Sequence, residues 1–161
     1  MRRVIDQKNE IVWTARFPSA PRISRKRRRA LIGIGGNIGD VKRAFDRLFL
    51  RFISDGAIDV IKTSPLFINP DFAAHNTPIF TNAVILIQTN LSAFALLKRL
   101  QNIEKRFGRT RSFKNAPRTL DLDILFFETK RSYNPKLLLP HPKWRDRASV
   151  TIPMLLLQGT I

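Results

Sequence analysis

FTNAVILIQTNLSAFALLKRLQNIEKRFG, residues 80–108, has the pattern of a strand followed by a helix. Its first part, residues 80–89, is rich in Val and Ile, which favours a buried strand. Ser92 is a suitable N-cap for a helix that ends at Gly108. Apolar residues recur along this helix at the spacing of one face, namely Leu96, Leu100, Ile103 and Phe107. The stretch therefore predicts a β–α unit whose two elements share one core.

A second unit of the same kind precedes it in the chain. Residues 30–35 form a short apolar run, which predicts a strand. The glycines that follow, within residues 33–39, indicate a tight turn into a helix that begins after Asp40. That helix ends at Ser54-Asp55-Gly56, and residues 57–63 predict the next strand.

A last strand is predicted over residues 122–127, so the order is βαβ followed by βαβ. This order is typical of an α+β domain of the ferredoxin-like, split-βαβ class. We expect a mixed or antiparallel sheet with both helices on one main face. Residues 64–79 and 108–120 contain prolines and predict two long loops, which in a small domain are often functional.

Length and composition exclude several classes of protein. A chain of 161 residues is enough for one compact domain and too little for two. No apolar run approaches the ~18 residues of a membrane-spanning helix, which argues against an integral membrane protein. Cysteine is absent, which excludes disulfide scaffolds, thiolate metal sites and cysteine nucleophiles. We expect a cytoplasmic monomer.

The charge is strongly positive, with 29 Lys and Arg against 12 Asp and Glu. Residues 1–29 contain ten basic and two acidic side chains, and residues 104–147 contain twelve and five. Dense like charges repel, so we expect residues 1–29 to be a mobile or loosely docked basic extension and residues 30–161 to be the single domain. One interpretation is that the extension is an arm that binds nucleic acid or another anionic surface. The interpretation that we favour is a lineage-specific addition without such a role. Trp13 and Phe17 could pack on the domain.

The strongest chemical signal is the pair Asp121 and Asp123. Successive side chains of a strand alternate between faces, so both carboxylates point the same way, with backbones roughly 6.5–7 Å apart. Such a pair suits a metal ion between the carboxylates, and without cysteine that ion should be Mg²⁺ rather than Zn²⁺. The alternative is that each aspartate pairs with a nearby arginine, and spacing alone does not decide between the two.

The residues around the pair are mostly cationic: Arg109, Arg111, Arg118, His141, Arg145 and Arg147. Carboxylate-held Mg²⁺ surrounded by arginines is suited to a polyphosphate. Asn82 lies on an apolar strand and could bond the edge of a flat heterocycle or a neighbouring loop. Glu104 could contact a ligand or hold Lys105 or Arg109. No GxxxxGK[ST] motif is present, which excludes a P-loop.

In chain order, these motifs resemble those of the 6-hydroxymethyl-7,8-dihydropterin pyrophosphokinase family. Residues 117–125, PRTLDLDIL, match its signature nearly letter for letter. The other matching segments are residues 34–40, 63–67, 80–83, 103–104 with 108–111, and 140–142 with Arg147. The resemblance covers about residues 30–157.

The resemblance implies transfer of the pyrophosphoryl group of ATP to the hydroxymethyl group of a dihydropterin, with release of AMP, in folate synthesis. It implies two Mg²⁺ ions on Asp121 and Asp123, with Arg109 and Arg118 acting on the transferring group. The residues implied for nucleotide binding are Gln101, Glu104, Arg111, Ile124, Lys136, His141 and Arg147. Those implied for pterin binding are Asn69, Phe72, Phe80 and Asn82.

Some positions depart from the family pattern. Ser149 stands where a phenylalanine is expected to stack on the pterin, and Trp144 or Phe72 could replace that ring. Asn69 stands where threonine is common, and Lys136 where arginine is. These departures bear on pterin affinity more than on the class of reaction.

Two other classes of function remain open at this stage. A ferredoxin-like RNA-binding module would fit the charge and the fold, although the aromatic motif of such modules is missing. A Mg²⁺-dependent phosphohydrolase or nuclease would use the same aspartates with water as the acceptor. Dependence of turnover on ATP and on pterin separates the three.

Overall fold

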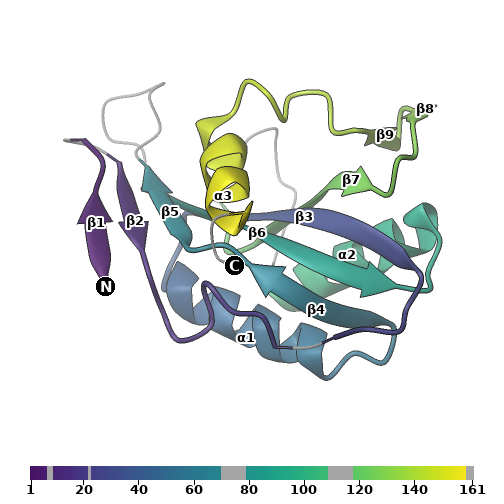
Figure 1. Ribbon diagram of the computed structural model, residues 1–161, viewed down its shortest axis with the longest axis horizontal. Helices are drawn as coiled ribbons and strands as arrows, with labels where there is room; N and C mark the ends of the chain where they lie inside the picture. Colours follow the sequence, from purple (N-terminus) through teal and green to yellow (C-terminus); the bar gives the residue numbers. More distant parts are fainter. Residues whose placement is uncertain (7–8, 22, 70–78, 109–117, 159–161) are drawn as a thin grey trace.

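The computed structural model describes residues 1–6, 9–21, 23–69, 79–108 and 118–158. Its main sheet has seven strands, and the path through it runs β1-β2-β5-β6-β3-β7, with β4 also paired to β6 (Figure 1). These strands are β1 (Arg2–Val4), β2 (Glu10–Val12), β3 (Arg28–Gly36), β4 (Ile58–Thr63), β5 (Leu66–Asn69), β6 (Phe80–Thr89) and β7 (Asp121–Phe127). Every pair of neighbours is antiparallel.

The centre of the sheet confirms the predicted ferredoxin-like order. β3 and β6 are the two inner strands, β7 follows β3 on one side, and β4 pairs with β6 on the other. β4 and β5 share one edge of β6, because Ser64 and Pro65 interrupt what would be a single strand. The Ser64 hydroxyl accepts the N–H of Val84 at 3.0 Å, so that backbone donor stays satisfied at the break.

Two helices cover one face of the sheet, as the sequence predicts (Figure 1). They are α1 (Val41–Ile53) and α2 (Ala93–Arg106). Asp40 caps α1 by accepting the N–H of Arg43, and Ser92 caps α2 by accepting the N–H of Ala95. Their apolar faces meet alternate residues of β3, β4 and β6 in one large core, which includes Phe45, Phe52, Leu96, Leu100, Ile32 and Ile85.

The opposite face is covered by a third helix, α3 (Ala148–Gln158), which the sequence did not predict. Val150 and Leu157 of α3 pack with Leu31, Val84 and Leu125 of the sheet. A separate two-stranded sheet, β8 (Ser132–Asn134) with β9 (Leu137–Leu139), was also not predicted. Among the described residues, no helix has both the length and the apolar character needed to cross a membrane.

Part of the N-terminal segment extends the main sheet, since β2 pairs with β5 and β1 pairs with β2. Phe17 is only 1% exposed and lies 6.0 Å from the ring of Phe45 and 6.2 Å from that of Phe49, measured between centroids. Thr63 adds two hydrogen bonds, from its hydroxyl to the carbonyl of Arg16 and from its N–H to that of Ser19. Phe17 therefore packs on the domain, while mobility of the basic extension stays a prediction.

The turn after α1 is held to α2 by a buried carboxylate. Asp55 accepts two hydrogen bonds from Arg99, each 2.7 Å long, and one of 2.9 Å from the N–H of Ala57. Burial by itself would raise the pKa of Asp55, but the bonds from Arg99 and Ala57 and the charges of Arg99 and Arg51 outweigh it, so the pKa is lowered. The charged form of Asp55 is thus the one that the fold stabilises.

Asp55→Asn is expected to lower the free energy of unfolding at pH 7 by about 1–3 kcal/mol, because it removes charge-assisted bonds. Since the folded pKa lies below the unfolded one, this contribution is complete above the ordinary carboxyl range, about pH 4, and is lost as the pH falls through the folded pKa. Urea unfolding of wild type and variant between pH 7 and pH 2 measures it. A difference between the two proteins that does not shrink in acid contradicts the assignment.

Candidate active site

Asp121 and Asp123 lie on the same face of β7. Their neighbours Leu122 and Ile124 are buried in the core under α1 and α2, while Leu125 belongs to the cluster under α3. Strand alternation therefore puts both carboxylates on the α3 side of the sheet, as the spacing predicts. The bulge in the β3–β7 pairing comes after this point, between Leu31 and Ile32 of β3, and leaves the pair in register.

Glycines of β3 lie directly beside the two aspartates. Gly35 is opposite Asp121 and Gly33 is opposite Asp123, while on its other edge Gly35 is opposite Asn82 of β6. A Cβ on Gly35 would lie 3.0 Å from Oδ1 of Asn82. No side chain therefore lies between the carboxylate of Asp121 and the amide of Asn82. The exposed backbone of Gly35 leaves a flat surface there, on which a planar ligand could lie.

The strand predicted over residues 30–35 is confirmed for Gly33 and Gly35, whereas the assignment of Gly36 to the following turn is wrong. All three belong to β3, whereas Gly39, with φ of +67°, lies in the turn before α1. The signal in the sequence is the alternation of Gly33 and Gly35 with Ile32 and Ile34. Residues two apart on a strand share a face, so this spacing predicts a strand with one bare side.

Arg118 is joined to Asp121 by an ion pair of 2.6 Å between Nη1 and Oδ2. The side chains are 24% and 21% exposed, so the pair sits at the surface of the site. The interpretation in which an aspartate pairs with a nearby arginine therefore holds for Asp121.

The segment before β7 is fixed by hydrogen bonds to the β3–α1 turn and to α2. Asn37 accepts the N–H of Arg118 through its side chain at 2.9 Å and donates its own N–H to the carbonyl of Arg118 at 3.0 Å. The hydroxyl of Thr119 donates to the carbonyl of Phe107 at 2.6 Å. Asn37 was not singled out from the sequence, because only the fold brings residues 37 and 118 together.

Glu104 of α2 is only 3% exposed, and its Oε1 accepts the N–H of Leu122 at 2.7 Å. β7 is the last strand on its side of the sheet, so this carboxylate satisfies a backbone donor that no further strand would meet. Because Leu122 lies between the two aspartates, Glu104 helps to set their position. Gln101, one turn earlier on α2, is half-buried.

His141 lies near the aspartates. Its backbone N–H donates a hydrogen bond of 2.9 Å to the carbonyl of Leu125. Burial lowers the pKa of His141, the charges of Asp123 and Asp121 raise it, and those of Arg147 and Lys143 lower it further. The net direction is down, so the imidazole is neutral at pH 7. Its Nδ1 accepts the N–H of Lys143 at 3.3 Å, which assigns the proton to Nε2.

The remaining sequence-predicted residues are distributed as follows. Asn69 lies at the end of β5, where its Oδ1 accepts the amide of Asn82 at 2.9 Å, and Phe80 is its half-buried partner in the ladder. Ile124 is buried under the helices, Arg147 is exposed before α3, and Lys136 is exposed in the turn between β8 and β9. Arg109, Arg111 and Phe72 lie outside the described residues.

The donor set fits a hard divalent cation. The two aspartates offer carboxylate oxygens on one face, and no group of three or more His, Cys, Asp or Glu side chains occurs in the described part of the chain. Mg²⁺ is commonly held by one or two carboxylates, with water and substrate phosphates as its other ligands. The arrangement therefore suits a metal that arrives with a phosphate ester.

Gly36→Ala tests how closely the end of β3 approaches Thr119, in the segment before β7. A Cβ at position 36 would lie 2.6 Å from the carbonyl oxygen of Thr119, which is backbone and cannot swing aside. We expect a loss of about 1–3 kcal/mol in the free energy of unfolding. Turnover should also fall, because Asp121 is only two residues after Thr119. Gly56→Ala is the matched control, since a Cβ there meets nothing within 4 Å. Equal melting temperatures for the two variants would contradict the prediction.

Comparison with known proteins shows one family. The family model described as 7,8-dihydro-6-hydroxymethylpterin-pyrophosphokinase matches residues 31–159. A Campylobacter jejuni protein named 2-amino-4-hydroxy-6-hydroxymethyldihydropteridine pyrophosphokinase is 48% identical over 125 residues, which is 78% of this chain and 80% of the relative. Proteins of the same name from Helicobacter pylori and Bacillus subtilis are 39% identical over 155 residues (92% of this chain, 93% of the relative) and 34% identical over 125 residues (78% and 75%).

The Helicobacter pylori match bears on the N-terminal segment. Residues 30–161 make up only about four-fifths of the chain, so a match over 92% of it includes part of residues 1–29. At least part of the basic extension is therefore shared with that relative.

Proposed function

Because the chain belongs to the 7,8-dihydro-6-hydroxymethylpterin-pyrophosphokinase family, we propose that the Asp121–Asp123 face of its sheet is the place of pyrophosphoryl transfer. The protein is a transferase that moves the pyrophosphoryl group of ATP to 6-hydroxymethyl-7,8-dihydropterin, a reaction of folate synthesis. In atoms, the hydroxymethyl oxygen bonds to the β-phosphorus of ATP, the bond from that phosphorus to the α–β bridging oxygen breaks, and AMP leaves. The hydroxyl proton is released.

The observation that supports this location best is the pair of carboxylates on one face of β7, with Arg118 against one of them. Phosphoryl transfer requires alignment and neutralisation of charge rather than a protein nucleophile. Asp121 and Asp123 would hold two Mg²⁺ ions, which when bound supply the positive charge that the polyphosphate needs. Arg118 could exchange its carboxylate partner for a phosphate oxygen, since guanidinium bonds both in the same geometry.

The pterin would lie on the flat surface formed by the backbone of Gly35, beside these carboxylates. Asn82 is in the same cross-strand row as Gly35 and Asp121, and its amide is oriented by Asn69. We propose that Asn82 bonds the edge of the heterocycle, with Asn69 holding it, and that Phe80 and Phe72 pack on the ring. Trp144, a candidate to replace the usual stacking ring at Ser149, packs edge-on against Phe126, with centroids 5.0 Å apart.

The nucleotide would enter from the side of α2, β7 and His141. For its contacts we propose Gln101, Arg111, Ile124, Lys136, His141 and Arg147, with Arg109 acting beside Arg118 on the transferring group. Glu104 would act chiefly as a positioning residue, because its Oε1 is bonded to the N–H of Leu122. We further propose that the protein acts as a monomer in the cytoplasm, and nucleic-acid binding by residues 1–29 stays a prediction.

The direct test measures AMP release from ATP and Mg²⁺, with and without 6-hydroxymethyl-7,8-dihydropterin. Pterin-dependent AMP formation that stops when Mg²⁺ is chelated supports the proposal. Release of ADP or AMP without pterin indicates a hydrolase instead. Absence of turnover in protein shown by circular dichroism to be folded would remove the proposed function from this site.

A further inference from the structure

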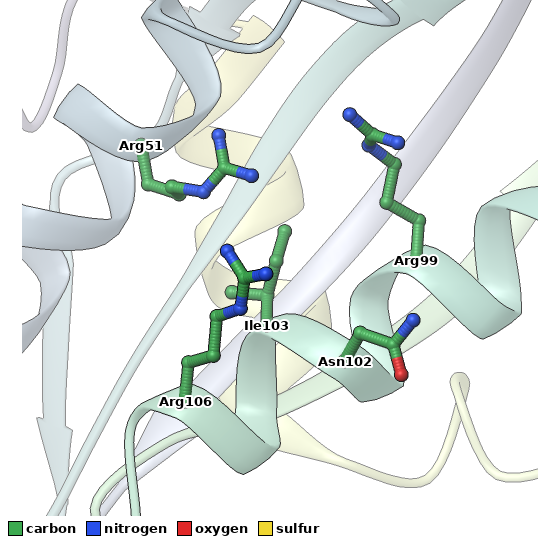
Figure 2. Close-up of a pocket in the computed structure, with 5 residues that line it drawn as sticks. All are labelled: Arg51, Arg99, Asn102, Ile103 and Arg106. Carbon is green, nitrogen blue, oxygen red and sulfur yellow. The ribbon is translucent and has the colours of Figure 1, made fainter.

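A pocket lined by arginines lies between α1 and α2, in the helical layer on the other side of the sheet from Asp121 and Asp123 (Figure 2). This arginine pocket has a volume of about 210 Å³ and is lined by Arg51, Arg99, Asn102, Ile103 and Arg106. The four residues from α2 follow the spacing i, i+3, i+4 and i+7, which places them on one side of the helix. Figure 2 shows Arg51 and Arg106 reaching toward the space between the helices, with Arg99 further along α2.

The arginine pocket has an excess of positive charge. Its three guanidinium groups are met by one carboxylate, Asp55, which bonds Arg99 at 2.7 Å and lies 3.6 Å from Arg51. The guanidinium group of Arg106 makes no ion pair or hydrogen bond within the part of the chain that the structure describes. Like charges around one cavity repel, and an anion placed between them removes that repulsion. The pocket is therefore built to favour an anion.

The size and the donors of the pocket indicate which anion. A volume of 210 Å³ is below the range of about 300–1,000 Å³ typical of drug-sized ligand sites, so the ligand is small. Guanidinium forks match phosphate oxygens two at a time. Arg99 and Arg106 are separated by about 10 Å along the helix axis, at 1.5 Å per residue. The two side chains therefore leave α2 from different turns, which suits contacts to two phosphoryl groups in succession.

We propose that the arginine pocket binds a diphosphate group, supplied either by free pyrophosphate or by a nucleoside diphosphate. Arg106 would be its main unshared cation, Arg51 and Arg99 would contribute the donors that Asp55 does not use, and Asn102 would offer its amide. This site is separate from the Asp121–Asp123 face and does not depend on the function proposed there.

The test is calorimetric titration of inorganic pyrophosphate into the full chain with divalent cations chelated, since Asp121 and Asp123 then repel the anion. Saturable binding is expected, weakened about tenfold or more by Arg106→Gln, which loses a charge-assisted contact. Lys98→Gln and Lys105→Gln are matched controls, because both lysines are exposed on α2 and line no part of the pocket. Asp55→Asn removes the competing carboxylate and is expected to strengthen binding.

Further titrations distinguish the source of the diphosphate group. Binding of ADP as tight as that of pyrophosphate assigns the site to nucleotides, and much weaker binding of ADP assigns it to free pyrophosphate. AMP or inorganic phosphate binding as tightly as pyrophosphate would overturn the diphosphate assignment. Equal losses in Arg106→Gln and the lysine controls, or no saturable binding, would overturn the site. Pterin-dependent AMP release should be unchanged in Arg106→Gln, so this outcome is independent of the proposed function.

Discussion

Asp121→Ala and Asp123→Ala are each expected to lower pterin-dependent AMP release by about 10²–10³-fold while leaving the protein folded. A bound metal ion stabilises the transition state by several kcal/mol, and each 1.36 kcal/mol corresponds to a tenfold change in rate. The fold should survive because the apolar residues of β7 that pack under the helices, Leu122 and Ile124, are untouched. The loss should therefore appear in turnover and not in the melting temperature.

Rates should be measured over a range of Mg²⁺ concentrations, with unfolding followed by circular dichroism. Asp46→Asn is a matched control, since that carboxylate lies on α1 and is 3.6 Å from Arg16 in a half-exposed pair. If Asp121 served only to hold Arg118, Asp121→Ala and Arg118→Gln would have equal effects on stability and Mg²⁺ dependence would be unchanged. A variant with near-normal Mg²⁺-dependent turnover would remove that aspartate from the proposed site.

The sequence predicts best those helices and strands in which buried apolar residues recur at a regular spacing. β6 and the two helices α1 and α2 have regular apolar spacing and cap residues, and their predicted ends agree with the observed ones to within about two residues. β5 was missed because Pro65 and Pro70 flank it within a stretch that predicts a loop. Its strand conformation comes from pairing with β6 and β2, which no local signal records.

α3 was missed for a different reason. Its apolar residues occur on nearly all sides rather than on one face, and Pro153 interrupts the helical pattern. The helix is specified by the apolar surface of the sheet that it covers, through Val150 and Leu157. β1, β2, β8 and β9 are three residues each, too short for a period to be seen.

In the candidate site, too, some features follow from the local sequence and others only from the assembled fold. The shared face of Asp121 and Asp123 follows from strand alternation within seven residues, so sequence alone predicts it. The pairing of Asn37 with Arg118 and that of Glu104 with Leu122 join residues 81 and 18 positions apart, and only the assembled sheet brings them together. The sequence could name Asn82 as an amide in need of a partner, but not that the partner is Asn69.

Phe17→Ala is expected to give the largest loss of stability, about 3–5 kcal/mol in the free energy of unfolding. The ring is 1% exposed and fills the space between Phe45 and Phe49 of α1, so truncation leaves a cavity that rigid helix packing cannot close. A small domain has only about 5–15 kcal/mol in total, so the variant should unfold at markedly lower urea concentration.

Phe94→Ala is the matched control, because that ring is 43% exposed on α2 and its removal should cost far less. Below its unfolding temperature Phe17→Ala should still release AMP in a pterin-dependent way, since Phe17 packs on the helical side of the sheet and the aspartates lie on the other. A loss below about 1 kcal/mol would mean that residues 1–29 dock only loosely, as their charge predicts. The full loss would make the segment around Phe17 part of the domain core.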